Sequence, residues 1–159
     1  MDDSTLISPF NFRVEIYPSG YGGDEVLALD GRGAFAEVQG LEMSLEVVSF
    51  REGGYNQGQR QLIGKATTQP LVLKRGLSLD RGFWLWIQRC MSGAFPLPYV
   101  NGRILAFPPE GERNQVAIWG FESGIATKVN AGALNAKGAQ DVAMEELQIV
   151  HERLWREVP

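Results

Sequence analysis

The residues from Gly31 to Ala36 have the spacing of a dinucleotide-binding loop. They read Gly-Arg-Gly-Ala-Phe-Ala, which matches the pattern GxGxxG/A, and a short apolar run precedes them. In dinucleotide-binding proteins this loop opens a helix whose N-terminus meets the pyrophosphate. Here the chain reaches Gly40 almost at once and then alternates as a strand, while Glu52, at the distance of a ribose-binding carboxylate, falls in a turn. We interpret the segment as a glycine turn between strands, and a small dinucleotide-binding enzyme is the alternative.

The segment Gly58–Thr67 resembles a phosphate-binding P-loop at first sight. The pattern GxxxxGK[ST], aligned on Gly64 and Lys65, requires a glycine at position 59, which is Gln59. The next position, where a hydroxyl would ligate magnesium, is Ala66. The segment therefore lacks two of the groups that hold a nucleotide phosphate.

Few residues are present for metal or nucleophile chemistry. His151 is the only histidine and Cys90 the only cysteine, so paired-histidine catalysis and histidine-rich metal sites are excluded. A Cys90–His151 dyad is formally possible, but Cys90 lies on the apolar face of an expected helix, where cysteine usually acts as a small hydrophobe. No pair of carboxylates lies in a context that would raise one pKa. We therefore expect no enzymatic activity, no cofactor and no metal site.

The bulk composition is typical of a soluble globular protein. The chain has 159 residues, of which 44% are hydrophobic and 21% charged, and we expect one domain over residues 1–159. The net charge of −4 gives no electrostatic support for nucleic-acid binding. The N-terminus is acidic, unlike that of a signal peptide, and the longest apolar run, Phe83–Ile87, is too short to cross a membrane. We expect a protein made in the cytoplasm that does not insert directly into a membrane.

Short alternating segments and scattered glycines predict a fold rich in β-strands. The 19 glycines are spread along the chain, as expected where turns and bulges separate short strands. Apolar and polar residues alternate in several segments, which is the pattern of half-buried strands. The expected strands are Phe12–Ile16, Val26–Leu29, Ala34–Val38, Glu42–Phe50, Leu71–Leu73, Arg103–Phe107 and Gln115–Phe121, with a tight turn at Asn101–Gly102.

The segment Leu79–Met91 has the strongest helical pattern. Ser78 is the expected N-cap, and Asp80 lies in the first turn, where a negative charge is favoured. Trp84 falls off the apolar face and is a candidate for burial by a neighbouring subunit. The face expected to pack on a sheet comprises Leu79, Phe83, Trp86, Ile87 and Cys90.

The last segment, Asp141–Trp155, fits two patterns. Its composition favours a helix, and propensity alone leads us to predict one. As a strand, the segment would place Leu147 and Ile149 on one side and Val150 on the other.

The polar segment Arg51–Gly64 is the main candidate for a functional surface. It follows a strand in which Met43, Leu45 and Val47 alternate with polar residues, so that one face is expected in a core and the other in water. The alternation stops at Arg51, and a glycine-rich polar arm continues to about Gly64. A strand that leads into such an arm indicates a part that contacts other subunits. The candidate contact residues are Arg51, Glu52, Gly53, Gly54, Tyr55, Asn56, Lys74, Arg75 and Trp84.

Several motifs occur along the chain in an order that is informative as a set. They are Phe12–Ile16, Phe35–Glu42, Phe50–Asn56, Leu71–Leu77, the helix with Trp84 and Trp86, the strand at Val116–Trp119, Asp141–Leu147 and His151–Glu152. In this order, and over most of the chain, they resemble the tail-tube family of contractile phages and related injection systems.

The resemblance implies a structural protein whose hexameric rings stack into a hollow tube inside a contractile sheath. Each subunit would be mainly β, with two packed antiparallel sheets in a barrel-like or sandwich-like fold and one helix outside; one sheet would line the lumen. It also implies that Asp141–Leu154 is a strand, which we prefer over the helix. The implied partners are further copies of the chain and the sheath, baseplate and spike proteins of the same apparatus, assembled in the bacterial cytoplasm.

Two features bear on the position of the subunit along such a tube. The arm at Arg51–Asn56 and the segment Leu73–Leu77 are more similar to tube-initiating subunits at the baseplate than to the repeating trunk subunit. The segment Tyr17–Gly33 is longer than is typical of the family, and Leu62–Gly64 replaces a more usual Leu/Met-Pro-Gly. We expect an initiator ring, with a trunk subunit as the alternative.

Overall fold

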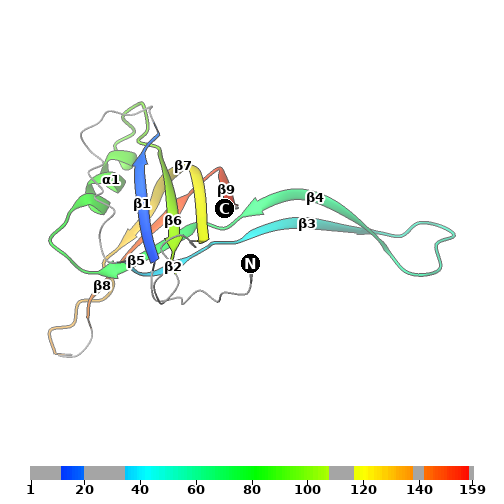
Figure 1. Cartoon of the computed structure of the whole chain (residues 1–159), viewed down its shortest axis with the longest axis horizontal. Helices are drawn as coiled ribbons and strands as arrows, with labels where there is room; N and C mark the ends of the chain where they lie inside the picture. Colours follow the sequence, from blue (N-terminus) through cyan, green and yellow to red (C-terminus); the bar gives the residue numbers. More distant parts are fainter. Residues whose placement is uncertain (1–11, 20–34, 108–116, 138–141, 158–159) are drawn as a thin grey trace.

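The computed structural model describes residues 12–19, 35–107, 117–137 and 142–157 (Figure 1). This part of the chain is mainly β with one helix, as expected. In chain order the elements are β1 (Phe12–Pro18), β2 (Phe35–Gln39), β3 (Met43–Phe50), β4 (Arg60–Thr68), β5 (Leu71–Gly76), α1 (Gly82–Met91), β6 (Val100–Ala106), β7 (Ala117–Asn130), β8 (Met144–Val150) and β9 (Arg153–Glu157).

The strands form two antiparallel sheets, which confirms the predicted fold class. Seven of them make one sheet, in which β1-β6-β7-β8-β5-β2 lie in this order and β9 also pairs with β7. The other two, β3 and β4, pair with each other and project from the body as a long hairpin (Figure 1). Neither sheet closes into a barrel within one described subunit.

The long strand β7 folds the large sheet over on itself. Its first half pairs with β6 and β9, its second half pairs with β8, and the strand turns between the two halves (Figure 1). At this turn Ser123 has a positive φ of 53°, and its N–H donates a hydrogen bond to Asn101 Oδ1 over 3.0 Å. The tight turn predicted at Asn101–Gly102 is therefore wrong: both residues lie inside β6, and Asn101 supports the turn of β7 instead.

The core lies between the two halves of the folded sheet, under α1. Helix α1 contributes the buried Phe83 and Trp86, as its pattern predicts, and Trp86 Nε1 donates a hydrogen bond to the Pro98 carbonyl over 2.9 Å. Burying an aromatic side chain of this size contributes about 2–3 kcal/mol to folding. The other core residues are Val14, Ile16, Leu71, Leu73, Val100, Ile104, Phe121, Ala126, Leu147, Ile149 and Leu154.

Helix α1 begins at Gly82, three residues later than predicted, with Arg81 as its N-cap. Leu79 is fully exposed and Ser78 lies outside the helix, so their predicted roles are wrong. The cause is Asp80, whose Oδ1 accepts a hydrogen bond from the Gly82 N–H over 2.9 Å. Asp80 thus supplies the acceptor that the first free N–H groups of a helix require.

In the segment Asp141–Trp155, the described residues from 142 onward contain strand β8 and most of strand β9, so the helix predicted from propensity is wrong and the strand implied by the resemblance is confirmed. Glu145, Leu147 and Ile149 are fully buried, while their neighbours in sequence are more exposed. Strand β8 pairs with β5 on one side and β7 on the other. The hydrogen bonds to these two strands pair the backbone N–H and C=O groups of β8. This pairing outweighs the modest preference of the sequence for a helix.

Of the glycine loop Gly31–Ala36, only Phe35 and Ala36 belong to the described residues. Both lie in β2, so the described end of the loop leads into a strand and not into a helix. The strand predicted at Val26–Leu29 lies outside the described residues.

Candidate assembly surface

The β3–β4 hairpin is the most prominent feature outside the body (Figure 1). Its strands pair from Met43 opposite Thr68 to Phe50 opposite Arg60. The arm predicted to start at Arg51 and to be polar as far as Gly64 is therefore too short: residues 51–59 are only the tip, and the arm spans Met43–Thr68. Strand β3 is exposed along its whole length, so the prediction that one of its faces lies in the subunit's core is wrong.

The hairpin continues the β2–β5 edge of the large sheet. Gln39 pairs with Val72 at the end of the body, and the next pair beyond the junction is Met43 with Thr68. Two short links, residues 40–42 and 69–70, join the two regions. Gly40 has φ +89°, and a Cβ added to it would lie 2.0 Å from the Pro70 carbonyl oxygen. Glycine is required here because the two links lie in direct contact.

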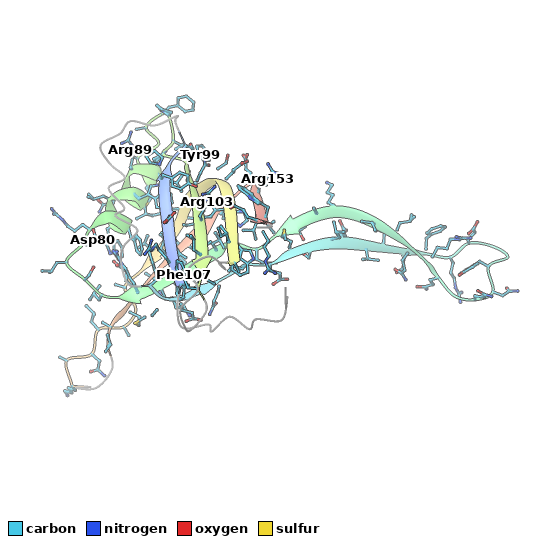
Figure 2. The ribbon with its side chains drawn as sticks, in the orientation of Figure 1. Asp80, Arg89, Tyr99, Arg103, Phe107 and Arg153 are labelled. Atoms are coloured by element: carbon cyan, nitrogen blue, oxygen red, sulfur yellow. The ribbon has the colours of Figure 1, made fainter. Side chains whose placement is uncertain are left out.

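One face of the hairpin is apolar and has no cover within the described subunit. Because β-strand side chains alternate, and the register shift lies between Leu45 and Val47, this face carries Met43, Leu45, Val47, Ile63 and Ala66. The exposed fractions of the first four are 58, 55, 58 and 72%. The side chains of the hairpin project into solvent on both sides (Figure 2). A two-stranded hairpin is marginally stable by itself in water, so covering this face would stabilise it.

The tip of the hairpin is organised around Arg60, a residue that we did not predict to lie in a functional site. Its Nε makes a short ion pair with Glu52 Oε2, and its guanidinium carbon lies 4.7 Å from the Tyr55 ring centroid. The Tyr55 N–H also donates to the Glu52 carbonyl over 3.2 Å. Opposite charges at positions 52 and 60, on either side of a glycine-rich turn, are the sequence signal for this contact. Of the expected contact residues, Arg51, Glu52, Gly53, Gly54, Tyr55 and Asn56 all lie exposed at this tip.

The other three expected contact residues lie on the body. Lys74 is on β5, where its Nζ lies 3.1 Å from Glu37 Oε2 on neighbouring β2. Gln39 and Lys74, in that order, lower the pKa of the Glu37 carboxyl through hydrogen bonds. Arg75 is only 5% exposed, so its side chain acts inside the subunit in place of the direct contact that we expected. Trp84 is half-buried on α1.

Arg75 and Trp84 belong to one network around a buried carboxylate. Arg75 Nε lies 2.7 Å from Glu145 Oε2, and Trp84 Nε1 donates to Glu145 Oε1 over 2.6 Å. A second Arg75 nitrogen lies 2.8 Å from Asp80 Oδ2, beside the start of α1 (Figure 2). The Gly82 N–H, followed by Arg75, lowers the pKa of Asp80. The network ties α1 to β5 and β8.

His151 lies at the base of the hairpin. It lies between β8 and β9, is 7% exposed, and its Nε2 is 3.1 Å from the carbonyl oxygen of Gln69 in the β4–β5 link. Burial lowers the pKa of His151 and raises that of Cys90. Both shifts disfavour the thiolate–imidazolium pair of a reactive cysteine, so neither residue has the character of a catalytic dyad.

The described residues offer little else for chemistry. No group of three or more His, Cys, Asp or Glu side chains among them could hold a metal ion. No helix in the described ranges has the length and apolar character needed to span a bilayer. Among the described surfaces, the hairpin is therefore the main candidate for a functional surface, because its apolar face is exposed to water.

Comparisons with solved structures show the same fold in chains of contractile injection particles and in an Hcp protein. A chain of "Cryo-EM Structure of an Extracellular Contractile Injection System, PVC sheath-tube complex in extended state" matches with a TM-score of 0.76 at 16% identity, covering 99% of this chain and 95% of that one. A chain of the anti-feeding prophage baseplate, 6-fold symmetrised, matches with a TM-score of 0.77 at 22% identity, covering 97% of each chain. A crystal structure of an Hcp protein matches with a TM-score of 0.56 at 13% identity, covering 92% of this chain and 91% of that one.

The sequence comparison identifies the family. No curated protein matches the chain. The profile described as T4-like virus tail tube protein gp19 matches residues 8–155. Since that match covers most of the sequence, the chain belongs to the T4-like tail tube protein gp19 family.

Proposed function

We propose that this protein is a structural subunit of the inner tube of a contractile injection system or contractile phage tail. In this role it forms hexameric rings that stack into a hollow conduit, and it catalyses no reaction. The observation that carries the proposal is the β3–β4 hairpin, whose apolar face has no cover within the described subunit of a tail-tube family member.

The exposed hairpin favours assembly with copies of the same chain. Each large apolar side chain removed from water contributes about 1.5–3 kcal/mol, and Met43, Leu45, Val47 and Ile63 are all more than half exposed. The hairpin lies on one side of the body (Figure 1). A protrusion that fits a different surface of the next copy gives a head-to-tail contact, and contacts of this kind generate rings and stacks.

The ends of the large sheet favour closure between subunits. Among the described strands, β1 and β2 lie at the two ends of the strand order and each pairs with one neighbour only. Unpaired strand edges attract further strands, and closing a sheet into a barrel removes them. In the proposed ring, copies of the chain pair along such edges and form a continuous barrel around the lumen.

We assign the contact between rings to the hairpin tip. Arg51, Glu52, Gly53, Gly54, Tyr55 and Asn56 lie farthest along the hairpin from its junction with the body and present charged, aromatic and backbone groups. Lys74 and Trp84 are candidates for contacts between neighbouring subunits on the body, and Arg75 supports Trp84 from inside through Glu145.

The position that we favour is the ring at the baseplate, with the repeating trunk as the second candidate. The arm at Arg51–Asn56 supports this choice, as does the likeness to a chain of a baseplate structure. The partners are then further copies of the chain, the baseplate and spike proteins, and the sheath. Assembly takes place in the bacterial cytoplasm, and the product is part of the particle.

The test is the assembly state of the purified chain. Size-exclusion chromatography with light scattering, followed by negative-stain imaging, should show species of six subunits and ring-shaped particles as concentration rises. A strict monomer at every concentration, also in the presence of sheath and baseplate components, would overturn the proposal. Titration of the protein with a dinucleotide, measured by calorimetry, tests the alternative that the chain is a dinucleotide-binding enzyme. We expect no binding.

A further inference from the structure

The only histidine of the chain joins the body to the base of the hairpin. His151 lies where β8 ends and β9 has not yet begun, and its ring packs near Phe121 of β7 with the ring centroids 6.2 Å apart. Its Nε2 lies 3.1 Å from the carbonyl oxygen of Gln69. Gln69 is one of the two residues that link β4, the returning strand of the hairpin, to β5 in the body.

Few contacts fix the direction of the hairpin at this junction. On one link, Gly40 packs directly against the Pro70 carbonyl, and the half-buried Leu41 packs against the core. On the other, the bond to His151 is the single side-chain hydrogen bond that the described residues make to residues 40–42 and 69–70. Beyond the junction β3 and β4 pair only with each other. A small change at the links therefore moves the whole hairpin.

We propose that His151 is a positioning residue that holds the hairpin in its direction, and that protonation of its ring in acid releases the hairpin. The proposal deepens the proposed function, since it adds acid sensitivity to the contact that the hairpin makes with neighbouring subunits. The holding step itself takes place within one subunit.

The hydrogen-bond partner fixes which ring nitrogen carries the hydrogen when His151 is neutral. A carbonyl oxygen only accepts, so Nε2 must carry the hydrogen, and the neutral ring keeps a lone pair on Nδ1. Nδ1 is buried and has no hydrogen-bond partner among the described residues. A proton added there would place a positive charge on a side chain that is only 7% exposed, which is unfavourable, and the backbone of Gln69 and Arg153 offsets this cost only in part.

The surrounding charges do not remove this penalty. Within two residues of His151, and of Phe121 near which its ring packs, the titratable residues are Glu122 on β7 and Glu152 and Arg153 beside the histidine; the link at 69–70 carries none. Glu122 Oε1 lies 3.8 Å from a guanidinium nitrogen of Arg153, so these two charges face each other. Among the described residues the His151 ring makes no ion pair. Burial lowers the pKa of His151, and the backbone of Gln69 and Arg153 only opposes that shift.

The lowered pKa of His151 determines how the hairpin responds to pH. The pKa of His151 is lower with the hairpin held than in a released state, where it returns to about 6.5. Above about pH 6.5 the His151 ring is neutral in both states, and the held state keeps its full stability relative to the released state. As the pH falls below about 6.5, the released state takes up the proton first, and the ratio of held to released subunits drops by up to about tenfold per pH unit.

The experiment measures the hairpin direction in the unassembled subunit. Spin labels on Gln57→Cys at the tip and Lys128→Cys on β7, in a Cys90→Ala background, report their separation by pulsed electron spin resonance. His151→Gln keeps an N–H donor near the position of Nε2 but does not titrate, and His151→Leu removes the donor at similar volume. Far-UV circular dichroism verifies that each variant is folded.

We expect a narrow distance distribution for the parent protein at pH 7.5 and a broad one at pH 5. His151→Gln should stay narrow at both pH values and His151→Leu broad at both. A narrow distribution for His151→Leu, or the same acid response in His151→Gln as in the parent, would overturn the proposal. If the distances follow the expected pattern but no rings form in any variant, the proposed function fails and the role of His151 stands. If His151→Leu does not fold, the pH response of His151→Gln still decides.

Discussion

Arg75 Nε lies 2.7 Å from Glu145 Oε2 in the interior of the subunit, across strands β5 and β8. The two side chains are 6% and 1% exposed, and the residues are opposite each other in the strand register. The ion pair is completed by Asp80 and Trp84, so both carboxylate oxygens of Glu145 have a partner. A buried charge pair with all its hydrogen bonds satisfied fixes the position of α1 against the sheet.

Removing one partner of this pair should destabilise the fold strongly. Arg75→Met leaves Glu145 buried without its cation, and the expected loss is about 3–5 kcal/mol in the free energy of unfolding. Urea unfolding followed by circular dichroism measures it. The matched control is Arg13→Met, because Arg13 lies 3.9 Å from Glu15 on the exposed surface. Exposed pairs contribute about 0–1 kcal/mol, and an equal loss in both variants would contradict the assigned role of the network.

Asp80 should make the start of α1 sensitive to acid. Its pKa is lowered by the Gly82 N–H and then by Arg75, so the stabilisation is complete above about pH 4, the unfolded value, and is lost as the pH falls through the lower folded value. Asp80→Asn keeps an acceptor oxygen but removes the charge. We expect the variant to lose less stability than the parent between pH 5 and about pH 2. Thermal unfolding across that range measures it, and parallel pH profiles would contradict the prediction.

The parts of the fold that sequence could predict are those with a local pattern. The alternation at Val14 and Ile16 predicts β1, and the spacing of Phe83 and Trp86 predicts the buried face of α1, because each pattern states which side chains point to one core. The hairpin tip was also found, since its glycines and polar residues mark an exposed turn.

The parts that were missed depend on partners far away in the sequence. Strand β4 has no clean alternation, and its pairing with β3 determines where it ends. Glu145 reads as a surface residue until Arg75, 70 positions earlier, is placed opposite it. His151 likewise gains its role from Gln69, 82 positions away. Non-local pairing of this kind leaves no periodic signal in one sequence.

The apolar face of the hairpin should matter for assembly and not for folding. Leu45→Lys places a charge on that face, and since the residue is 55% exposed in the subunit, unfolding of the monomer should change little. In the assembled ring the same charge would be buried, so we expect ring formation to fall by more than about tenfold, equivalent to at least 1.4 kcal/mol. Analytical ultracentrifugation measures the change. Glu46→Lys, on the opposite face of β3, is the adjacent control and should assemble more nearly like the parent.

Gly40 should tolerate no side chain, because the two links at the base of the hairpin are in direct contact at this residue. Gly40→Ala introduces a Cβ that would lie 2.0 Å from the Pro70 carbonyl oxygen, at a φ of +89° that residues with side chains rarely adopt. The links must separate, and the expected cost is at least about 1–3 kcal/mol in unfolding free energy. Gly53→Ala is the matched control, since a Cβ there meets nothing within 4 Å. Urea unfolding should separate the two variants, and equal stabilities would show that the junction accommodates the extra atom without cost.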